Sequence, residues 1–256
     1  MSNDAIKVIS QLKTRNFTTA DRDILLRFLV FSSRLTAWRL GKRNASASAV
    51  ERWRALIKQL SLTTKLLRVG KFIQHFEFAA RILTGKHQDR FLGHVTIARQ
   101  LLMAVHMTCD NATLLNSIGF VPWKGAKGLE TRAFRVWFSA TLCGVVIQLY
   151  CFYRLHLSSK GREEGDEPTV FQQTASKLQL FSGLCDLSVS SAAAGVVRLD
   201  EGVVSLCGLT SSIIAIYTQF RSSHGFGVAR ASMVGNSVAN QRYKAESGIL
   251  DMLGNR

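Results

Sequence analysis

The amino-acid sequence predicts an all-α membrane protein, in which amphipathic N-terminal helices precede two transmembrane helices with an additional embedded helix between them. Proline occurs only twice in 256 residues and glycine-rich hairpin signals are scarce, so the chain favours helices. Two stretches of 18 and 19 residues carry no charge. The net charge of +16 implies an acidic partner, either nucleic acid or an anionic membrane surface.

The N-terminal half is predicted to form successive helices. Residues 20–40 place apolar side chains at helical spacing with four arginines between them, and Asp21 suits the N-cap position. A loop over residues 41–48 leads to a second helix over 49–61. A further helix is expected over residues 91–109, followed by a loop at 117–128 that contains glycine and proline.

The stretch TKLLRVGKFIQHFEFAARIL, residues 64–83, is predicted to be a single amphipathic helix. Its pattern fits both a helix packed within a soluble bundle and a helix lying in the membrane plane. A second, weaker apolar edge (Leu67, Phe78 and Ile82) would suit pairing with another helix. On a membrane, the headgroup-binding basic residues would be Lys65, Arg68, Lys71 and Arg81, and the inserted apolar face would be Val69, Phe72, Ile73, Phe76, Ala80 and Leu83.

Two uncharged stretches are predicted to span the membrane. Residues 136–153 would form a helix about 27 Å long, close to the hydrocarbon thickness of about 30 Å. Trp137 lies near one end of this stretch and Tyr153 near the other, as in interfacial aromatic belts. Residues 202–220 form the second span. Between them, apolar residues 178–197 contain Asp186, which is costly at a bilayer centre, so an embedded helix is expected there.

The charge distribution divides the chain into five regions. Residues 1–135 carry 23 basic and 8 acidic residues, a net +15, and are expected to form a basic helical region in the cytosol or on the membrane surface. Four regions follow: the first span (136–153), an acidic loop with the embedded helix (154–201, net −2), the second span (202–220) and a cytosolic tail (221–256, net +3). Lysine and arginine positions favour both termini in the cytosol. The charge concentrated before two spans favours the membrane interpretation of residues 64–83.

No catalytic or metal-binding motif is present in the sequence. The five cysteines form no CxxC pair, the six histidines have no HxxxH spacing, and no GxxxxGK[ST] loop occurs. We therefore expect neither an enzyme nor a cofactor or metal site. Within the last predicted span, Gly208 and Ser212 form a small-xxx-small pair that suits a helix–helix contact.

Four blocks of the sequence occur in a distinctive order. RDILLRFLVFSSRLTAWRL at 22–40 precedes LIKQLSLTTKLLRVGKFIQHFEFA at 56–79, which contains a Lys-Leu-x-Arg-x-Gly-Lys-Phe pattern. LCDLSVSSAAAG at 184–195 then precedes DEGVVSLCGLTSSIIAIYTQF at 200–220. In this order the blocks resemble the peroxin-11 family, whose members elongate and divide peroxisomes. Residues 86–135 have no counterpart among these blocks.

The resemblance implies a multi-pass protein of the peroxisomal membrane, or of the glycosomal membrane in an organism with glycosomes, with both termini cytosolic. It implies membrane remodelling by the amphipathic helix, self-association, and recruitment of a dynamin-related fission GTPase through a tail-anchored adaptor. A cytosolic import receptor for peroxisomal membrane proteins is a further expected partner, and nucleic acid is not. The alternative is an oligomeric pore or carrier for small metabolites, to which Asp186 would contribute an embedded polar group.

Overall fold

The computed structural model describes residues 19–84, 89–160 and 170–223, and within these ranges all regular structure is helical. The predicted all-α class is therefore confirmed for the described part of the chain. The helices are α2 (Thr19–Lys42), α3 (Ala47–Leu67), α4 (Lys71–Thr84), α5 (Arg90–Ala112), α6 (Leu114–Ile118), α7 (Ala126–Lys160), α8 (Val170–Ala193) and α9 (Glu201–Ser223).

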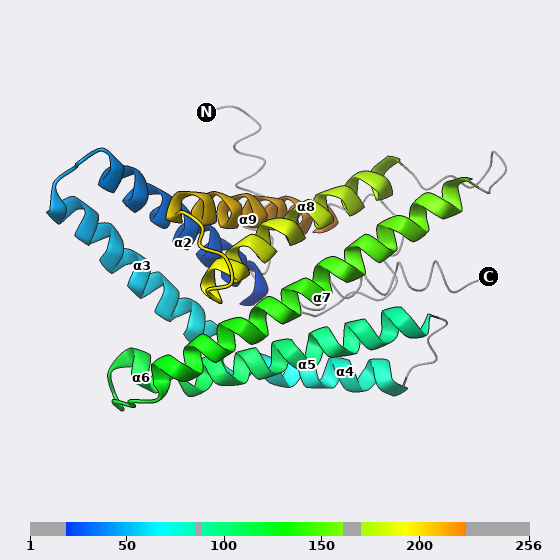
Figure 1. Cartoon of the computed structure of the whole chain (residues 1–256), viewed down its shortest axis with the longest axis horizontal. Coiled ribbons are helices and arrows are strands. Elements are labelled where there is room, and N and C mark those ends of the chain that lie inside the picture. The colour runs from blue at the N-terminus through cyan, green and yellow to red at the C-terminus, as the bar shows by residue number, and fades with distance from the viewer. Residues whose placement is uncertain (1–18, 85–88, 161–169, 224–256) are drawn as a thin grey trace.

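The order in which the helices pack differs from their order in the sequence (Figure 1). Starting from α3, close neighbours follow one another as α2, α9, α8, α7, α5 and α4. Helices α2 and α9 lie side by side although they stand at opposite ends of the described chain. Helices α3 and α4 are consecutive in sequence, yet α3 packs mainly on α2 and α4 packs on α5.

Helices α7 and α9 contain two segments long and apolar enough to cross a membrane, Ala126–Arg154 and Glu201–Gln219. These segments contain or overlap the two uncharged stretches predicted as spans, residues 136–153 and 202–220. Only 22% and 33% of their most apolar windows are buried inside the molecule, whereas the core helix of a soluble protein is mostly buried. Their uncovered apolar surface suits a lipid environment.

Helix α8 coincides with most of the stretch predicted as an embedded helix, residues 178–197. It begins earlier, at Val170, and ends at Ala193, where the chain turns through Gly195 at a φ of +72°. It packs between α7 and α9. The location of α8 within a bilayer stays a prediction.

Two glycines of α9 allow α2 to approach closely. A Cβ atom on Gly208 would lie 2.3 Å from Cε1 of Phe31, and one on Gly202 would lie 2.6 Å from the indole of Trp38. Ser211 and Ser212, on the same helix, are almost completely buried. Small residues therefore bring these two helices together, as in membrane helix pairs that associate by close packing rather than by the hydrophobic effect.

The prediction of one helix over residues 64–83 is wrong, because the chain turns in the middle of that stretch. Helix α3 ends at Leu67, the backbone N–H of Val69 donates to the Leu66 carbonyl at 3.2 Å, and Gly70 adopts a φ of +80°. Helix α4 then begins at Lys71. A left-handed residue ends an α-helix, and glycine adopts that conformation without a steric penalty.

The expected N-cap at Asp21 is also wrong. Helix α2 already begins at Thr19, so Asp21 lies in its first turn. Its carboxylate is buried and accepts a hydrogen bond of 2.8 Å from Nε2 of Gln219 on α9. This acidic residue therefore connects two helices instead of capping one.

Replacing Gly208 with alanine is expected to destabilise the α2–α9 contact, because the added methyl group would overlap the Phe31 ring. Overpacking of this kind costs about 1–3 kcal/mol, which should lower the melting temperature of the detergent-solubilised protein. Gly41→Ala is a matched control, because a Cβ there meets nothing within 4 Å and alanine favours the helix. Equal melting temperatures for the two variants would contradict the close packing.

Candidate membrane interface

Helix α4 turns its two apolar edges in different directions. The weaker edge predicted from the sequence faces the protein, since Phe78 and Ile82 are buried with His75 and Ala79. Helix α5 is the neighbour that covers this side. The main apolar face is left uncovered: Val69, Ile73, Phe76 and Leu83 are 46–67% exposed, Ala80 is exposed and Phe72 is half-buried.

Three of the four basic residues predicted to bind headgroups make ion pairs across the α3–α4 turn. Lys65 Nζ lies 3.1 Å from an Asp110 carboxylate oxygen and 3.0 Å from one of Glu130. Arg68 Nε and Lys71 Nζ lie 3.0 and 3.3 Å from the two oxygens of Asp23. We call these six residues the turn clamp: Asp23, Lys65, Arg68, Lys71, Asp110 and Glu130.

The turn clamp brings together α2, α5 and α7 around the point where α3 becomes α4. Burial alone would raise the pKa of Asp23, but Arg68 and Lys71 outweigh it and hold the pKa below its ordinary value. Burial would likewise lower the pKa of Lys65, yet Asp110 and Glu130 raise it overall. Asp23 and Lys65 are therefore both charged at neutral pH. The fourth predicted headgroup ligand, Arg81, pairs with Glu77 one turn earlier on the exposed side of α4.

Two buried histidines fix α4 and α7 against α5. Nδ1 of His75 lies 2.7 Å from Oε1 of Gln100, and Nδ1 of His106 lies 3.0 Å from the Ala133 carbonyl oxygen. The His106 ring also stacks on Trp137, with ring centroids 5.8 Å apart. Burial lowers the pKa of both histidines, so each is neutral at pH 7. Among the described residues, no group of three His, Cys, Asp or Glu side chains is placed to hold a metal ion.

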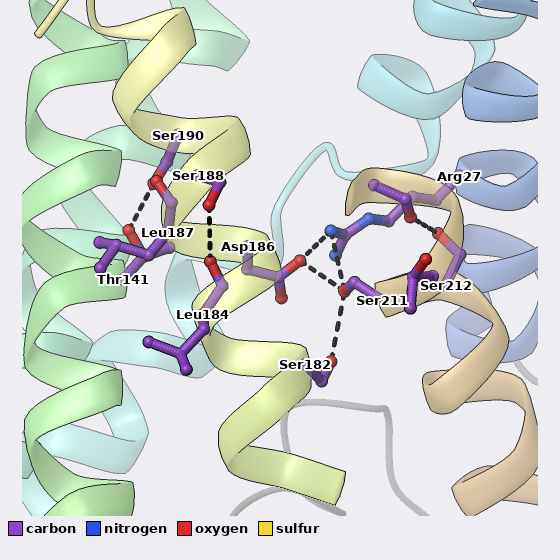
Figure 2. A network of polar contacts seen from close by, with 12 residues as sticks. Arg27, Thr141, Ser182, Leu184, Asp186, Leu187, Ser188, Ser190, Ser211 and Ser212 are labelled. Carbon is purple, nitrogen blue, oxygen red and sulfur yellow. Dashed lines mark hydrogen bonds and ion pairs between the residues drawn. The ribbon is translucent and has the colours of Figure 1, made fainter. Parts of the chain in front are cut away.

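Asp186 is the acid of a polar network that joins α2, α8 and α9 (Figure 2). Its carboxylate pairs with the Arg27 guanidinium and accepts a hydrogen bond of 2.5 Å from the Ser211 hydroxyl. Arg27 also donates to Ser211 at 3.2 Å, and the Ser182 hydroxyl donates to Ser211 at 3.3 Å. Burying a carboxylate is costly unless it is paired, and here Arg27 and Ser211 meet that requirement.

The small-residue pair predicted to seat another helix lies against a helix of the same chain. Gly208 faces Phe31 of α2, and the buried Ser212 hydroxyl donates to the Gly208 carbonyl at 2.7 Å. The structure thus places Gly208 at the contact between α2 and α9.

The described helices include two that are long and apolar enough to span a bilayer, and one, α4, whose main apolar face is uncovered. These features are typical of the class of helical membrane proteins. The sequence model of the family described as Peroxisomal biogenesis factor 11 matches residues 9–220. The chain therefore belongs to the Peroxisomal biogenesis factor 11 family, and the resemblance drawn from its sequence blocks is confirmed. This is a family of peroxisome biogenesis factors, which indicates a role at the peroxisomal membrane.

Individual relatives agree with this assignment. The chain is 22% identical over 219 residues to Peroxisomal biogenesis factor 11 of Schizosaccharomyces pombe, an alignment covering 79% of this chain and 91% of that protein. It is 26% identical over 238 residues to Peroxisomal membrane protein 11B of Homo sapiens and of Bos taurus, covering 77% of this chain and 91% of each relative. No solved structure matches the chain.

Replacing Asp186 with alanine is expected to destabilise the protein by about 3–5 kcal/mol, because the part-buried Arg27 would lose its carboxylate. The double variant Arg27→Met, Asp186→Leu should recover much of this loss, because both charges leave together. Denaturant titration of the solubilised protein measures the free energies of unfolding of the wild type, of Asp186→Ala, of Arg27→Met, of Asp186→Leu and of the double variant. A double variant as unstable as the sum of its two single variants would contradict the pairing.

The stability of the turn clamp is expected to depend on acidic pH. Because the pKa of Asp23 is depressed in the folded protein, its stabilising contribution is present above the unfolded pKa and is lost as pH falls through the folded pKa. At neutral pH, Asp23→Asn should cost about 1.5–3 kcal/mol through the weakened bonds to Arg68 and Lys71. This difference from the wild type should shrink as pH falls below about 4.

Denaturant titrations between neutral and acidic pH measure this dependence. Glu77→Gln is a matched control, because its pair with Arg81 is exposed and such helical pairs contribute only about 0.3–0.5 kcal/mol. A constant difference between wild type and Asp23→Asn across the acidic range would argue against the clamp.

Proposed function

We propose that this protein remodels and elongates the peroxisomal membrane through the exposed apolar face of α4, and thereby promotes peroxisome division and proliferation. The observation that carries the proposal is the separation of the two edges of α4. One edge is fixed against α5, while the other presents large apolar side chains that no described helix covers. In an organism with glycosomes, the same function applies to the glycosomal membrane.

Shallow insertion of α4 supplies a physical route to curvature. A large apolar side chain gains about 1.5–3 kcal/mol when it is fully buried, so several half-exposed side chains such as Ile73 and Phe76 provide substantial binding energy. An in-plane helix occupies the headgroup and upper acyl region of one leaflet only. Expansion of that leaflet relative to the other bends the bilayer. The apolar helices α7 and α9 would keep the protein in the membrane that it bends.

The electrostatic contribution to this binding is shared with other parts of the chain. In the clamped conformation Lys65, Arg68 and Lys71 are occupied by carboxylates, so anionic headgroups compete with Asp23, Asp110 and Glu130 for them. Helix α3 has no buried residue. It exposes further basic side chains that could bind anionic headgroups: Arg52, Arg54 and Lys58. Each basic residue near an anionic leaflet contributes about 1 kcal/mol.

The family membership also supports proposals about topology and partners. We place both termini in the cytosol, in accord with the basic region before α7. Self-association would concentrate α4 helices on one patch of membrane. A dynamin-related GTPase, recruited through a tail-anchored adaptor, would then cut the elongated organelle, and a cytosolic import receptor would deliver the protein. The alternative of a metabolite pore has less support, because Asp186 is engaged by Arg27 and Ser211.

Placing charge on the exposed face of α4 is expected to abolish remodelling without unfolding the protein. In the variant Ile73→Glu, Phe76→Glu, insertion of α4 would bring two carboxylates into the bilayer. Because burying an unpaired charge is costly, this variant should not insert. Purified full-length protein should tubulate anionic vesicles under the electron microscope, and this variant should not. In cells that lack the protein, the wild type should restore elongated peroxisomes and the double glutamate variant should not.

The matched control is Ile73→Leu, Phe76→Leu, which keeps both side chains apolar and should tubulate vesicles like the wild type. Tubulation by the double glutamate variant would remove α4 from the mechanism. Failure of the wild type itself to tubulate vesicles would remove the remodelling function.

A further inference from the structure

A second uncovered apolar surface lies on the connection between α5 and α7. It comprises α6 and the turn after it, and its five large apolar side chains are 46–78% exposed, with Phe120 the most exposed. We call this surface the α6 knob: Leu115, Ile118, Phe120, Val121 and Trp123. In Figure 1 it lies at one end of the molecule, beside the start of α7 and the end of α3.

The backbone of the α6 knob is fixed by hydrogen bonds of its own. Helix α6 ends at Ile118, and the C-cap residue Gly119 has a φ of +86°. The N–H groups of Phe120 and Val121 both donate to the Leu115 carbonyl, at 3.0 and 3.3 Å. The N–H of Trp123 donates to Oδ1 of Asn116 at 2.9 Å. These donors are therefore already paired when the knob enters a less polar medium, where an unpaired donor would be costly.

The charges around the α6 knob suit an anionic surface. No acidic residue occurs between Asp110 and Glu130, while Lys124 directly follows Trp123 and Lys127 lies in the first turn of α7. Asp110 and Glu130 are both held by Lys65, at 3.1 and 3.0 Å, and so are already paired. Aromatic side chains next to lysines at the end of a spanning helix are typical of the membrane–water interface.

The position of the α6 knob along the chain also favours contact with the membrane surface. The knob leads directly into α7, whose 35 residues extend about 52 Å, longer than a bilayer of about 40–45 Å with its headgroups. The apolar part of α7, residues 136–153, fits the hydrocarbon core, and interfacial Trp and Lys side chains near the end of a spanning helix help to fix its tilt and depth.

We propose that the α6 knob is a second membrane anchor, which inserts Phe120 and Trp123 at the headgroup–acyl boundary of the leaflet that α7 enters. It acts independently of α4 and sets where α7 begins in the bilayer. Lys124 and Lys127 strengthen the insertion when the leaflet is anionic.

The test measures where Trp123 lies in full-length protein reconstituted into phosphatidylcholine vesicles, with and without phosphatidylserine. Trp38, Trp53 and Trp137 are replaced by phenylalanine so that Trp123 is the only indole. We expect lipids brominated near the glycerol end of the chains to quench Trp123 more than lipids brominated near the chain ends. Aqueous acrylamide should quench it weakly. Phe120→Ser should shift its emission to the red, and Lys124→Glu, Lys127→Glu should remove the effect of phosphatidylserine.

A matched variant that keeps only Trp137 reports insertion of α7 in the same vesicles. Strong acrylamide quenching of Trp123, without quenching by brominated lipid, would overturn the proposal by placing the knob in water. Shielding of Trp123 from both quenchers would also overturn it, because a second copy or another protein would then cover the knob. In the Ile73→Glu, Phe76→Glu background the quenching of Trp123 should persist, so failure of α4-driven remodelling and failure of the knob are distinguishable.

Discussion

The close contact between α2 and α9 is the constraint on which the rest of the structure depends. It recurs along the length of α2: Asp21 accepts from Gln219, Arg27 reaches Ser211, Phe31 packs on Gly208 and Trp38 packs on Gly202. The neighbouring face of α2 carries Asp23, which holds Arg68 and Lys71 of the α3–α4 turn. Helix α2 thus connects α9, a candidate spanning helix, to the start of α4, so α9 and the start of α4 are held in a fixed relation.

The sequence was sufficient to predict the helical class, the two apolar helices and the two edges of α4. Each of these follows from composition or from a local period of apolar side chains, for example Ile73, Phe76 and Ala80 on one side. The break at Gly70 was missed, because the apolar period continues through it and only the surrounding helices decide its φ. The turn clamp was missed for a related reason: Arg68 and Lys71 meet a carboxylate more than forty positions away, at Asp23.

One local signal for the clamp was present in the sequence. Acidic residues are scarce before the first span, and Asp23 lies in the apolar, arginine-bearing stretch that forms α2. A carboxylate among apolar side chains requires a cation as partner, and residues 1–135 contain more basic than acidic residues. The sequence alone does not show which basic residue pairs with Asp23. The pairing depends on the angle between α2 and α3 and on the direction of α4 after the turn.

The turn between α3 and α4 has a consequence for the response of the molecule to ionic conditions. Helix α4 is attached to α5 through buried apolar side chains, whereas the turn itself is held by opposite charges that are only partly buried. At 0.15 M ionic strength the Debye length is about 8 Å, longer than these ion pairs of 3.0–3.3 Å, and partly buried pairs are screened less than exposed ones. Only ionic strength well above this value therefore loosens the turn, while the apolar contacts still hold α4 on α5.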